Sequence, residues 1–253
     1  MGKIISFSNQ KGGVGKTTSV SEIAENLSQE YDKKVLMIDL DPQASLTSLK
    51  DNMHEIISND EGTMTDIMMR RLNIEDIIRP IKNNLYLAPT TLVLSDAELN
   101  LVNATMRELI LEKELSKIKD NYDYILIDCP PSRGILTVNA LSSSDSVIIP
   151  VQAEYQALLG MQLLKNTIKN VKDQINEKLN VSGYIITMAT HTNHSNDIIK
   201  TIMNDSIPVI AKIPRSIDIS DAGVANESTY AYNHENKSGI EYLKLTKYIL
   251  ENK

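Results

Sequence analysis

The chain has 253 residues, 42% of them hydrophobic and 23% charged, which is typical of a globular protein large enough for one sizeable core. Its formal net charge of -7 excludes a general polycation that coats DNA, so contact with nucleic acid would need a local basic patch. The single cysteine, Cys129, excludes an internal disulfide and fits a reducing cytoplasm. We expect no signal peptide and no membrane span, because no apolar run approaches the roughly 18 residues that a span needs.

Short apolar runs alternate with longer helical patterns along the chain. In chain order, strands are expected at 3–8, 34–39, 84–88, 122–128, 146–150, 181–189 and 209–213. Helices are expected at 16–30, 105–119, 133–143, 155–179, 194–205 and 238–251. Runs such as YILID and SVIIPV are apolar throughout, as in parallel strands that are covered on both faces. In the less readable region 50–83, TMTDIMMRRL predicts a helix capped by Thr63 or Thr65.

The alternation of strands and helices predicts one α/β domain over residues 1–253. Its expected core is a doubly wound, mostly parallel sheet flanked by helices, as in P-loop NTPases. In such a fold, ligands bind at the carboxyl ends of the strands.

The stretch SNQKGGVGKTT, residues 8–18, follows the first strand and leads into the first helix, which is the setting of a phosphate-binding loop. Glycines let the backbone turn so that its N–H groups point at phosphate oxygens, and the helix N-terminus adds its positive end. Lys16 would reach the β- and γ-phosphates, the Thr17 hydroxyl would hold Mg²⁺, and Thr18 would contact the α-phosphate. The expected nucleotide-binding residues of this loop are Gly12, Gly13, Val14, Gly15, Lys16, Thr17 and Thr18.

Two acidic motifs stand at the ends of apolar strands. VLMIDLDPQAS places Asp39 and Asp41 at a strand end, pointing the same way. One carboxylate would support the water shell of a metal, and the other would orient an attacking water. YDYILIDCPPS ends an apolar strand at Asp128, which is the Walker B arrangement for supporting Mg²⁺ through water. Pro130 and Pro131 stiffen the following loop, which would then sense the γ-phosphate.

Together, these motifs resemble the deviant Walker A ATPases of the ParA/Soj partition family. The resemblance rests on KGGVGKTT, DLDPQAS, ILIDCPPSRGILTVNAL, VIIPVQAEYQALLGMQLL and IPRSIDISDA, and it is weakest at 50–83 and 226–237. In that family the first loop glycine is not required, so Gln10 is no defect, and the lysine at the position of Lys11 is the signature. The resemblance implies ATP and Mg²⁺ as cofactors, and a homodimer in which Lys11 reaches the partner's nucleotide as an arginine finger does.

The resemblance also implies roles for single residues. Asp41 would position or polarise the attacking water, and Asp39 would stay near the metal with Thr17 and Asp128. Gly12 would lie at the dimer face, where a side chain should obstruct close approach. Two further residues fall where relatives line the adenine, namely Pro214 and Arg215. The implied catalytic residues are Lys11, Lys16 and Asp41.

The function that the resemblance implies is ATP-dependent partition of a plasmid or a chromosome. The ATP dimer would bind DNA non-specifically and associate with the nucleoid, and a ParB-like centromere-binding partner would stimulate its weak ATPase activity. The DNA contact departs from the family pattern, because His191 and Asp218 stand where close relatives often carry arginine, and Asp221 adds negative charge. The basic residues that remain in this half are Arg215, Lys212, Lys200, Lys165, Lys169 and Lys172, the last three expected on a solvated helix face.

Other classes of function fit the sequence less well. The main alternative is a ParA-like ATPase that positions a protein assembly without strong DNA binding, which the missing arginines favour. A MinD-like membrane ATPase would insert the C-terminal GIEYLKLTKYILENK into lipid, but such a helix more often packs on the sheet, and this one lacks a strongly basic polar face. An iron–sulfur protein is excluded, because a cluster that bridges two subunits needs four thiolates and one cysteine per chain supplies two.

Overall fold

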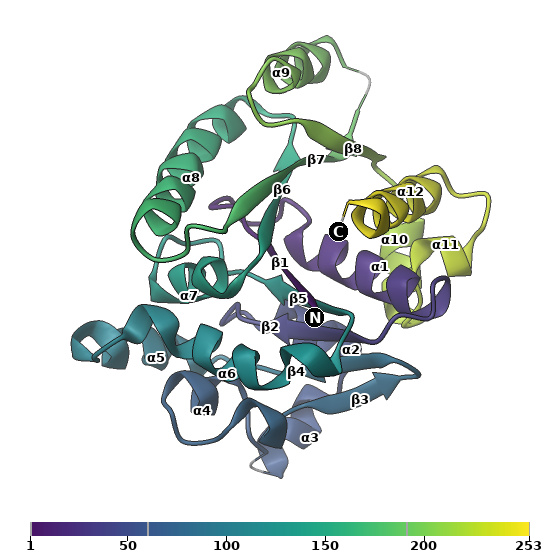
Figure 1. The fold of residues 1–253 in the computed structure, drawn as a ribbon. Coiled ribbons are helices and arrows are strands. Elements are labelled where there is room, and N and C mark those ends of the chain that lie inside the picture. Colours follow the sequence, from purple (N-terminus) through teal and green to yellow (C-terminus); the bar gives the residue numbers. More distant parts are fainter. Residues whose placement is uncertain (1, 60, 191, 253) are drawn as a thin grey trace.

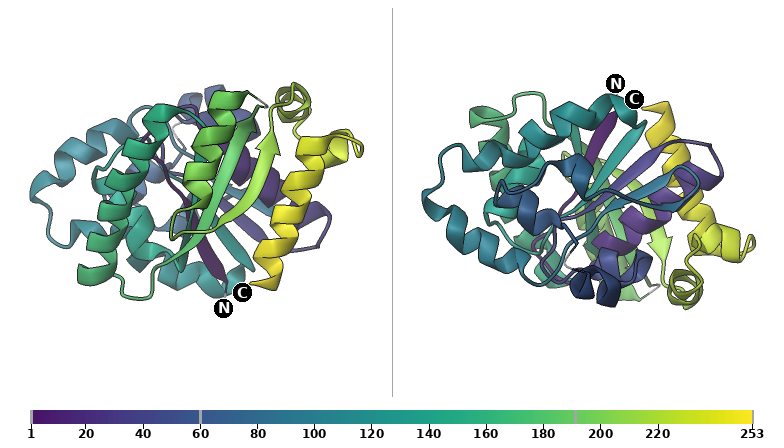
Figure 2. Two further views of the ribbon diagram at one scale, coloured as in Figure 1. Left: turned by 90° about the horizontal axis from the view of Figure 1, so that it is seen from above. Right: turned by 90° about the horizontal axis from the view of Figure 1, so that it is seen from below.

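The computed structural model describes residues 2–59, 61–190 and 192–252, and it centres on an eight-stranded sheet with helices on both faces (Figures 1 and 2). The strand order is β3-β4-β2-β5-β1-β6-β7-β8, and all neighbours are parallel except β3 and β4. The strands are β1 (Lys3–Phe7), β2 (Val35–Asp39), β3 (Arg79–Lys82), β4 (Leu85–Ala88), β5 (Tyr124–Asp128), β6 (Ser146–Gln152), β7 (Asn180–Ala189) and β8 (Val209–Pro214). This architecture confirms the predicted α/β fold.

The α-helices are α1 (Lys16–Gln29), α2 (Ser45–Lys50), α3 (Met53–Ser58), α4 (Met64–Met68), α5 (Leu94–Asn100), α6 (Ile110–Ile118), α7 (Ile135–Ser143), α8 (Tyr155–Gln174), α9 (Asn193–Met203), α10 (Asp218–Val224), α11 (Thr229–Tyr232) and α12 (Lys237–Glu251). Short 3₁₀ turns lie at Ile74–Asp76, Leu101–Asn103, Arg107–Leu109 and Lys119–Asn121. Among the residues described, no helix is both long and apolar enough to span a bilayer.

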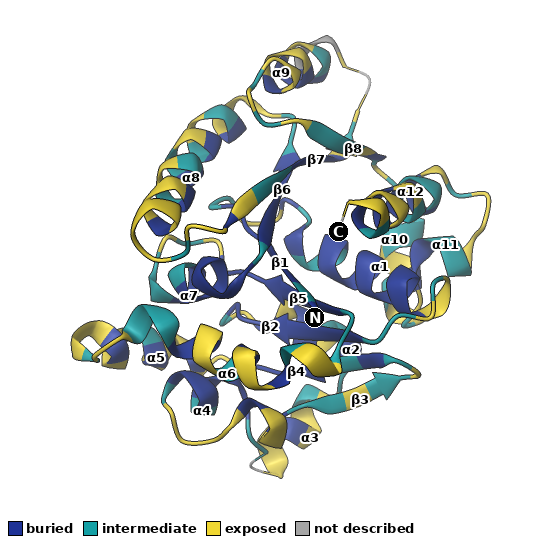
Figure 3. Cartoon of the chain, in the orientation of Figure 1, coloured by how far each residue is buried: buried dark blue, intermediate teal, exposed yellow. Residues whose placement is uncertain are grey.

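Successive residues of the central strands serve opposite cores. Leu36 and Ile38 of β2 pack with α4, α6 and α7, whereas Val35 and Met37 pack with α1 and α12 on the other face. This alternation is the consequence of the two-residue period of a strand. Both cores are apolar, which explains why β2 and β5 read as unbroken hydrophobic runs and are buried along their whole length (Figure 3).

The phosphate-binding loop lies at the topological switch point of the sheet, where the strands that follow β1 in the sequence continue on both of its sides. β1 lies between β5 and β6, so the loop after β1 emerges beside the carboxyl ends of both neighbours. Crevices of this kind are where ligands bind in doubly wound sheets. The loop after β2 lies one strand further along the same edge, because β2 pairs with β5.

All seven expected strands and six expected helices have counterparts, with ends displaced by a few residues. The region 50–83 holds α3, α4 and the edge strand β3, and the capping residue of α4 is Thr63, whose hydroxyl accepts the Thr65 N–H at 3.3 Å. The C-terminal helix α12 packs on the sheet, as the sequence favoured. It buries Tyr242, Leu245 and Ile249 against α1 and β8.

Candidate active site

The loop between β1 and α1 has the backbone of a phosphate-binding loop. Gly13 and Gly15 adopt φ values of 72° and 83°, in the left-handed region that favours glycine, and Gly15 directly precedes α1. The Thr187 hydroxyl on β7 donates to the Val14 carbonyl oxygen at 2.8 Å and thereby ties the loop to the sheet. A Cβ atom at Gly15 would lie 3.4 Å from the Thr187 methyl carbon, an ordinary van der Waals contact, so the left-handed φ and not a lack of space favours glycine there.

Thr17 and Asp128 meet at the first turn of α1. The Thr17 hydroxyl donates to Asp128 Oδ2 at 2.6 Å, and Asp128 Oδ1 has no hydrogen-bond partner among the described residues. Asp128 is completely buried, and burial together with the nearby Asp39 charge raises its pKa well above the ordinary value. Lys16, itself 6% exposed, partly opposes that shift.

Asp39 stands directly opposite Asp128 in the pairing of β2 with β5. Its Oδ2 accepts the backbone N–H and the hydroxyl of Thr47, both at 2.7 Å, and its Oδ1 accepts the Asp41 N–H at 3.2 Å. Burial raises the pKa of Asp39 to about 6, although the Thr47 hydrogen bonds oppose the rise. Asp41, which is 8% exposed, accepts one N–H from Gln43 at 3.0 Å.

This group of side chains fits a magnesium ion that is bound together with a nucleotide. Within the described chain, no three acidic, histidine or cysteine side chains are arranged to hold a metal by themselves. Mg²⁺ in nucleotide sites usually has one or two carboxylates, and phosphate oxygens and water complete its octahedron. The unpartnered Oδ1 of Asp128, the Thr17 hydroxyl and Asp39 supply that kind of oxygen donor.

Lys11 lies on the exposed side of the loop. Its ammonium group forms an ion pair with Glu154 at the start of α8, and the two side chains are 29% and 56% exposed. Cβ atoms at Gly12 and Gly13 would have no neighbour within 4 Å. This side of the loop is therefore open in the single chain.

A cavity of about 220 Å³ continues from the loop toward α10 and α12. Gly15, Thr18 and Arg215 line it, so the structure brings one of the two expected adenine residues next to the loop. Pro214 instead lines a neighbouring depression of about 500 Å³ over β8 and α12. Residues that the sequence analysis missed also line the first cavity, namely Thr187, Met188, Ile213, Ser216, Ile219, Ser220 and Tyr242. Their contact with the loop has no local sequence signal.

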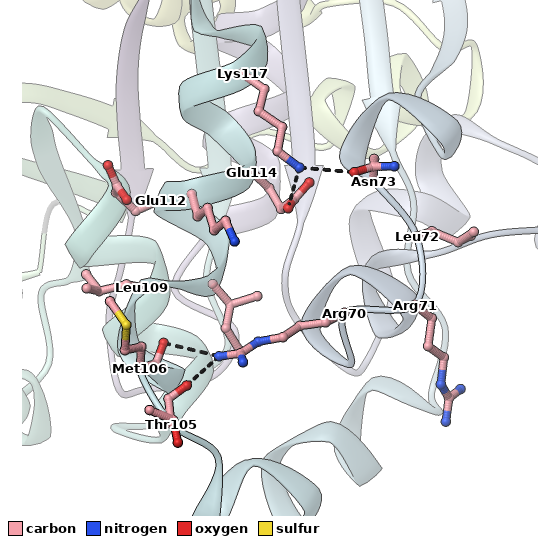
Figure 4. A pocket seen from close by; sticks show the side chains of 12 residues that line it. Arg70, Arg71, Leu72, Asn73, Thr105, Met106, Leu109, Glu112, Glu114 and Lys117 are labelled. Atoms are coloured by element: carbon pink, nitrogen blue, oxygen red, sulfur yellow. Dashed lines mark hydrogen bonds and ion pairs between the residues drawn. The ribbon is translucent and has the colours of Figure 1, made fainter.

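A larger cavity of about 670 Å³ lies away from this site, between the turn after α4 and helix α6 (Figure 4). Arg70 crosses it and donates to the carbonyl oxygens of Thr105 and Met106 at 2.5 and 3.5 Å, and Lys117 pairs with Glu114 at 2.7 Å on the opposite wall. None of the expected phosphate or metal residues lines it.

The expected DNA-contact positions are only partly described. His191 lies outside the described residues. Asp218 Oδ2 accepts hydrogen bonds from the side-chain amides of Asn233 and Asn236, both at 2.8 Å, so this carboxylate links α10 to the segment before α12. Lys165 and Lys200 pair with acidic neighbours. The remaining exposed cations of α8 are Lys169 and Lys172, and those around the 500 Å³ depression are Lys212, Lys237 and Lys244.

Comparisons with known proteins agree with this geometry. The family model of an AAA domain matches residues 2–181. The sporulation initiation inhibitor protein Soj of Bacillus subtilis is 39% identical, covering 100% of both chains. The chromosome-partitioning ATPase Soj of Treponema pallidum is 37% identical, covering 99% of this chain and 98% of its own.

Solved structures show the same fold. Cobyrinic acid a,c-diamide synthase from Mycobacterium smegmatis, with bound ADP and magnesium, superposes with a TM-score of 0.86 at 30% identity, covering 100% of this chain and 95% of its own. A putative plasmid partition protein from Borrelia burgdorferi, bound to AMPPNP, superposes with a TM-score of 0.84 at 27% identity, covering 100% of both chains. The glycine loop, the paired acids of β2 and β5 and these full-length similarities establish that the chain belongs to the ParA/Soj family of partition ATPases.

Proposed function

We propose that this protein is a Mg²⁺-dependent ATPase that drives partition of a DNA molecule through an ATP-bound homodimer. The observation that carries the proposal is the meeting of three sequence-distant motifs at one sheet edge. The loop at residues 8–15 follows β1, Asp39 is the last residue of β2, and Asp128 is the last residue of β5. These strands are neighbours in the order β2-β5-β1, and the Thr17 hydroxyl donates to Asp128 at 2.6 Å. Relatives that carry the names partition ATPase and plasmid partition protein support the same function.

The chain's own groups divide the work of hydrolysis. The loop N–H groups of Gly12, Gly13, Val14 and Gly15 would bind phosphate oxygens, with Lys16 at the β- and γ-phosphates and Thr18 at the α-phosphate. Bound Mg²⁺ would neutralise charge on the phosphates. Thr17, Asp39 and Asp128 would hold it directly or through its water shell. Arg215, which lines the 220 Å³ cavity next to the loop, would lie beside the base.

Asp41 is proposed to position the attacking water. It keeps 8% exposure, whereas Asp39 is completely buried and hydrogen-bonded through both oxygens. Asp41→Ala should therefore bind ATP and form a dimer that persists, because hydrolysis no longer ends it. Size-exclusion chromatography after addition of ATP tests this, and rapid turnover in the variant would remove Asp41 from the mechanism.

Lys11 is proposed to act on the nucleotide of the partner subunit. It lies on the open side of the loop, and its ion pair with Glu154 is partly solvated, so the side chain can exchange partners at small cost. Lys11→Ala should retain ATP binding and lose stimulated hydrolysis. Lys113→Ala on α6 is the matched control, since it removes an exposed lysine remote from the loop. Unchanged stimulation in Lys11→Ala would refute the role.

Non-specific DNA binding is proposed to use the lysines around the depression over β8 and α12. Lys212, Lys237 and Lys244 line it beside a single carboxylate, Glu241, which pairs with Lys244 at 2.7 Å. Phosphate contacts of this kind weaken with salt. The stimulating partner would be a ParB-like protein bound to the cargo, and the ATP dimer would associate with the nucleoid.

The test is binding to random-sequence duplex DNA by Asp41→Ala with ATP, with ADP and without nucleotide, at two salt concentrations. Salt-sensitive binding with ATP alone supports DNA partition. Absence of binding in every state favours a second candidate, an ATPase that positions a protein assembly. That candidate rests on Asp218, an acidic residue where relatives often carry arginine, whose carboxylate accepts hydrogen bonds from Asn233 and Asn236.

A further inference from the structure

The carboxylate of Asp39 is held by one residue that no motif identified. Thr47 donates both its backbone N–H and its hydroxyl to Asp39 Oδ2, each at 2.7 Å. Among the described residues, Asp39 Oδ1 receives only the Asp41 N–H, at 3.2 Å. One carboxylate oxygen is thus saturated by Thr47, and the other retains acceptor capacity toward the site.

The Thr47 hydroxyl is oriented by its own surroundings. Its oxygen accepts the backbone N–H of Thr90 at 3.0 Å, just beyond the end of β4. A hydroxyl has a single proton, so the one that Thr47 gives to Asp39 has no alternative direction once Thr90 occupies the acceptor side. Both threonines are completely buried, so water does not compete for these bonds.

Helix α2, which carries Thr47, is fixed at its far end as well. Lys50 in its last turn pairs with Glu25 of α1 at 2.6 Å, and both side chains are completely buried. Lys50 also donates to the Asn226 side chain at 3.1 Å. Helix α2 is therefore held by Asp39 of β2 and by Glu25 of α1, so Thr47 meets Asp39 at a defined position.

We propose that Thr47 is a positioning residue for the hydrolysis of Mg·ATP, which fixes Asp39 so that Oδ1, the oxygen that accepts a single N–H, faces the water shell of the cation. This inference rests on the proposed role of Asp39 beside Mg²⁺. Partners of this kind behind a metal-site carboxylate typically contribute 10- to 100-fold to metal affinity. A backbone N–H alone would leave the carboxylate with one bond fewer and a wider range of orientations.

The experiment compares Thr47→Val with Thr47→Ser, because valine keeps the shape and removes the hydroxyl whereas serine keeps it. The matched control is Thr246→Val on α12, where an equally buried hydroxyl donates to the Tyr242 carbonyl at 2.8 Å, away from the sheet edge that holds Asp39. A fluorescent ATP analogue is titrated into each protein at a series of Mg²⁺ concentrations and also in EDTA. Thermal melting of each variant accompanies the titration.

We expect Thr47→Val to need about 10-fold more Mg²⁺ for half-maximal enhancement of nucleotide binding. Binding in EDTA should not change, and Thr47→Ser and Thr246→Val should stay within about 2-fold of the wild type, against that 10-fold effect. Equal Mg²⁺ dependence in Thr47→Val and wild type would overturn the inference, as would the same shift in Thr246→Val. Wild-type binding that ignores Mg²⁺ would instead refute the proposed function. If Thr47→Val does not fold, Thr47→Cys replaces it, and its weak S–H donor should give a smaller shift in the same direction.

Discussion

The buried pair of Lys50 and Glu25 allows the structure's energetics to be tested directly. Lys50 Nζ lies 2.6 Å from Glu25 Oε1, and both side chains are completely buried. Lys82 approaches the other oxygen, Glu25 Oε2, at 3.2 Å, and Gln29 donates to the same oxygen at 2.6 Å. Burial lowers the pKa of Lys50, and the Glu25 charge opposes this, so the ammonium depends on its partner.

Lys50→Met removes one charge and leaves Glu25 buried. Breaking a buried pair costs about 3–5 kcal/mol, because the remaining charge lacks compensation. Lys82 and Gln29 still contact Glu25, so we expect the lower end, about 3 kcal/mol. For a chain of this size, that loss corresponds to a fall in Tm of about 6–12 °C.

The double variant Lys50→Met/Glu25→Leu removes both charges. Apolar replacement of an entire buried pair is often neutral, so the double variant should lose no more than about 1 kcal/mol relative to wild type. Lys244→Met is the control, since its pair with Glu241 is largely exposed and should be worth under about 1 kcal/mol. Urea unfolding without nucleotide measures all four proteins. A double variant as unstable as Lys50→Met would refute the argument that uncompensated charge causes the loss.

Three further outcomes are expected, two at the nucleotide site and one at the buried Glu22 of α1. Gly12→Val should leave the urea midpoint unchanged, because a Cβ there meets nothing within 4 Å, and should abolish the ATP-dependent dimer in light scattering; a dimer that survives would place Gly12 off the interface. Burial raises the pKa of Glu22 to about 7, so this carboxyl group binds a proton more tightly in the folded than in the unfolded protein. The stabilisation that results is fully present below pH 4.5 and is lost as the pH rises to 7. The unfolding free energy of Glu22→Gln should therefore depend less on pH across that interval than that of the wild type. The same pH dependence in both proteins would contradict the raised pKa of Glu22. Thr17→Ala should weaken Mg²⁺-dependent nucleotide binding by at least about 10-fold without changing binding in EDTA, as isothermal titration calorimetry would measure.

The strands and the phosphate loop could be predicted because their determinants are local. Continuous apolar runs such as 35–38 and 124–127 specify strands covered on both faces, and the structure buries each of them completely. Gly15 directly precedes α1 and has a left-handed φ, a conformation that favours glycine. The family resemblance could be predicted for the same reason, since each motif is a run of residues adjacent in the sequence.

The region 50–83 was unreadable because its elements are short and stabilised by distant partners. β3 has only four residues, includes Pro80, and pairs only with β4 at the edge of the sheet. α3 and α4 have six and five residues, too few for a helical period to show. The roles of Thr47 and Glu154 could not be predicted for a related reason, since their partners, Asp39 and Lys11, are distant in the sequence and meet them only in the folded chain.

Two groups of the proposed catalytic machinery have partners within the single chain. Lys11 pairs with Glu154 of its own chain, and the Thr17 hydroxyl donates to Asp128. A hydroxyl that coordinates Mg²⁺ through its oxygen can still donate to a carboxylate, so the Thr17 bond is compatible with a loaded site. The Lys11 pair is different, because in the role proposed for Lys11 its ammonium group must reach a phosphate of the partner subunit, whereas in the single chain it pairs with Glu154. Under the proposed function, weak hydrolysis by the isolated chain is therefore the expected consequence of where Lys11 rests, and assembly of the dimer is what gives it another anion.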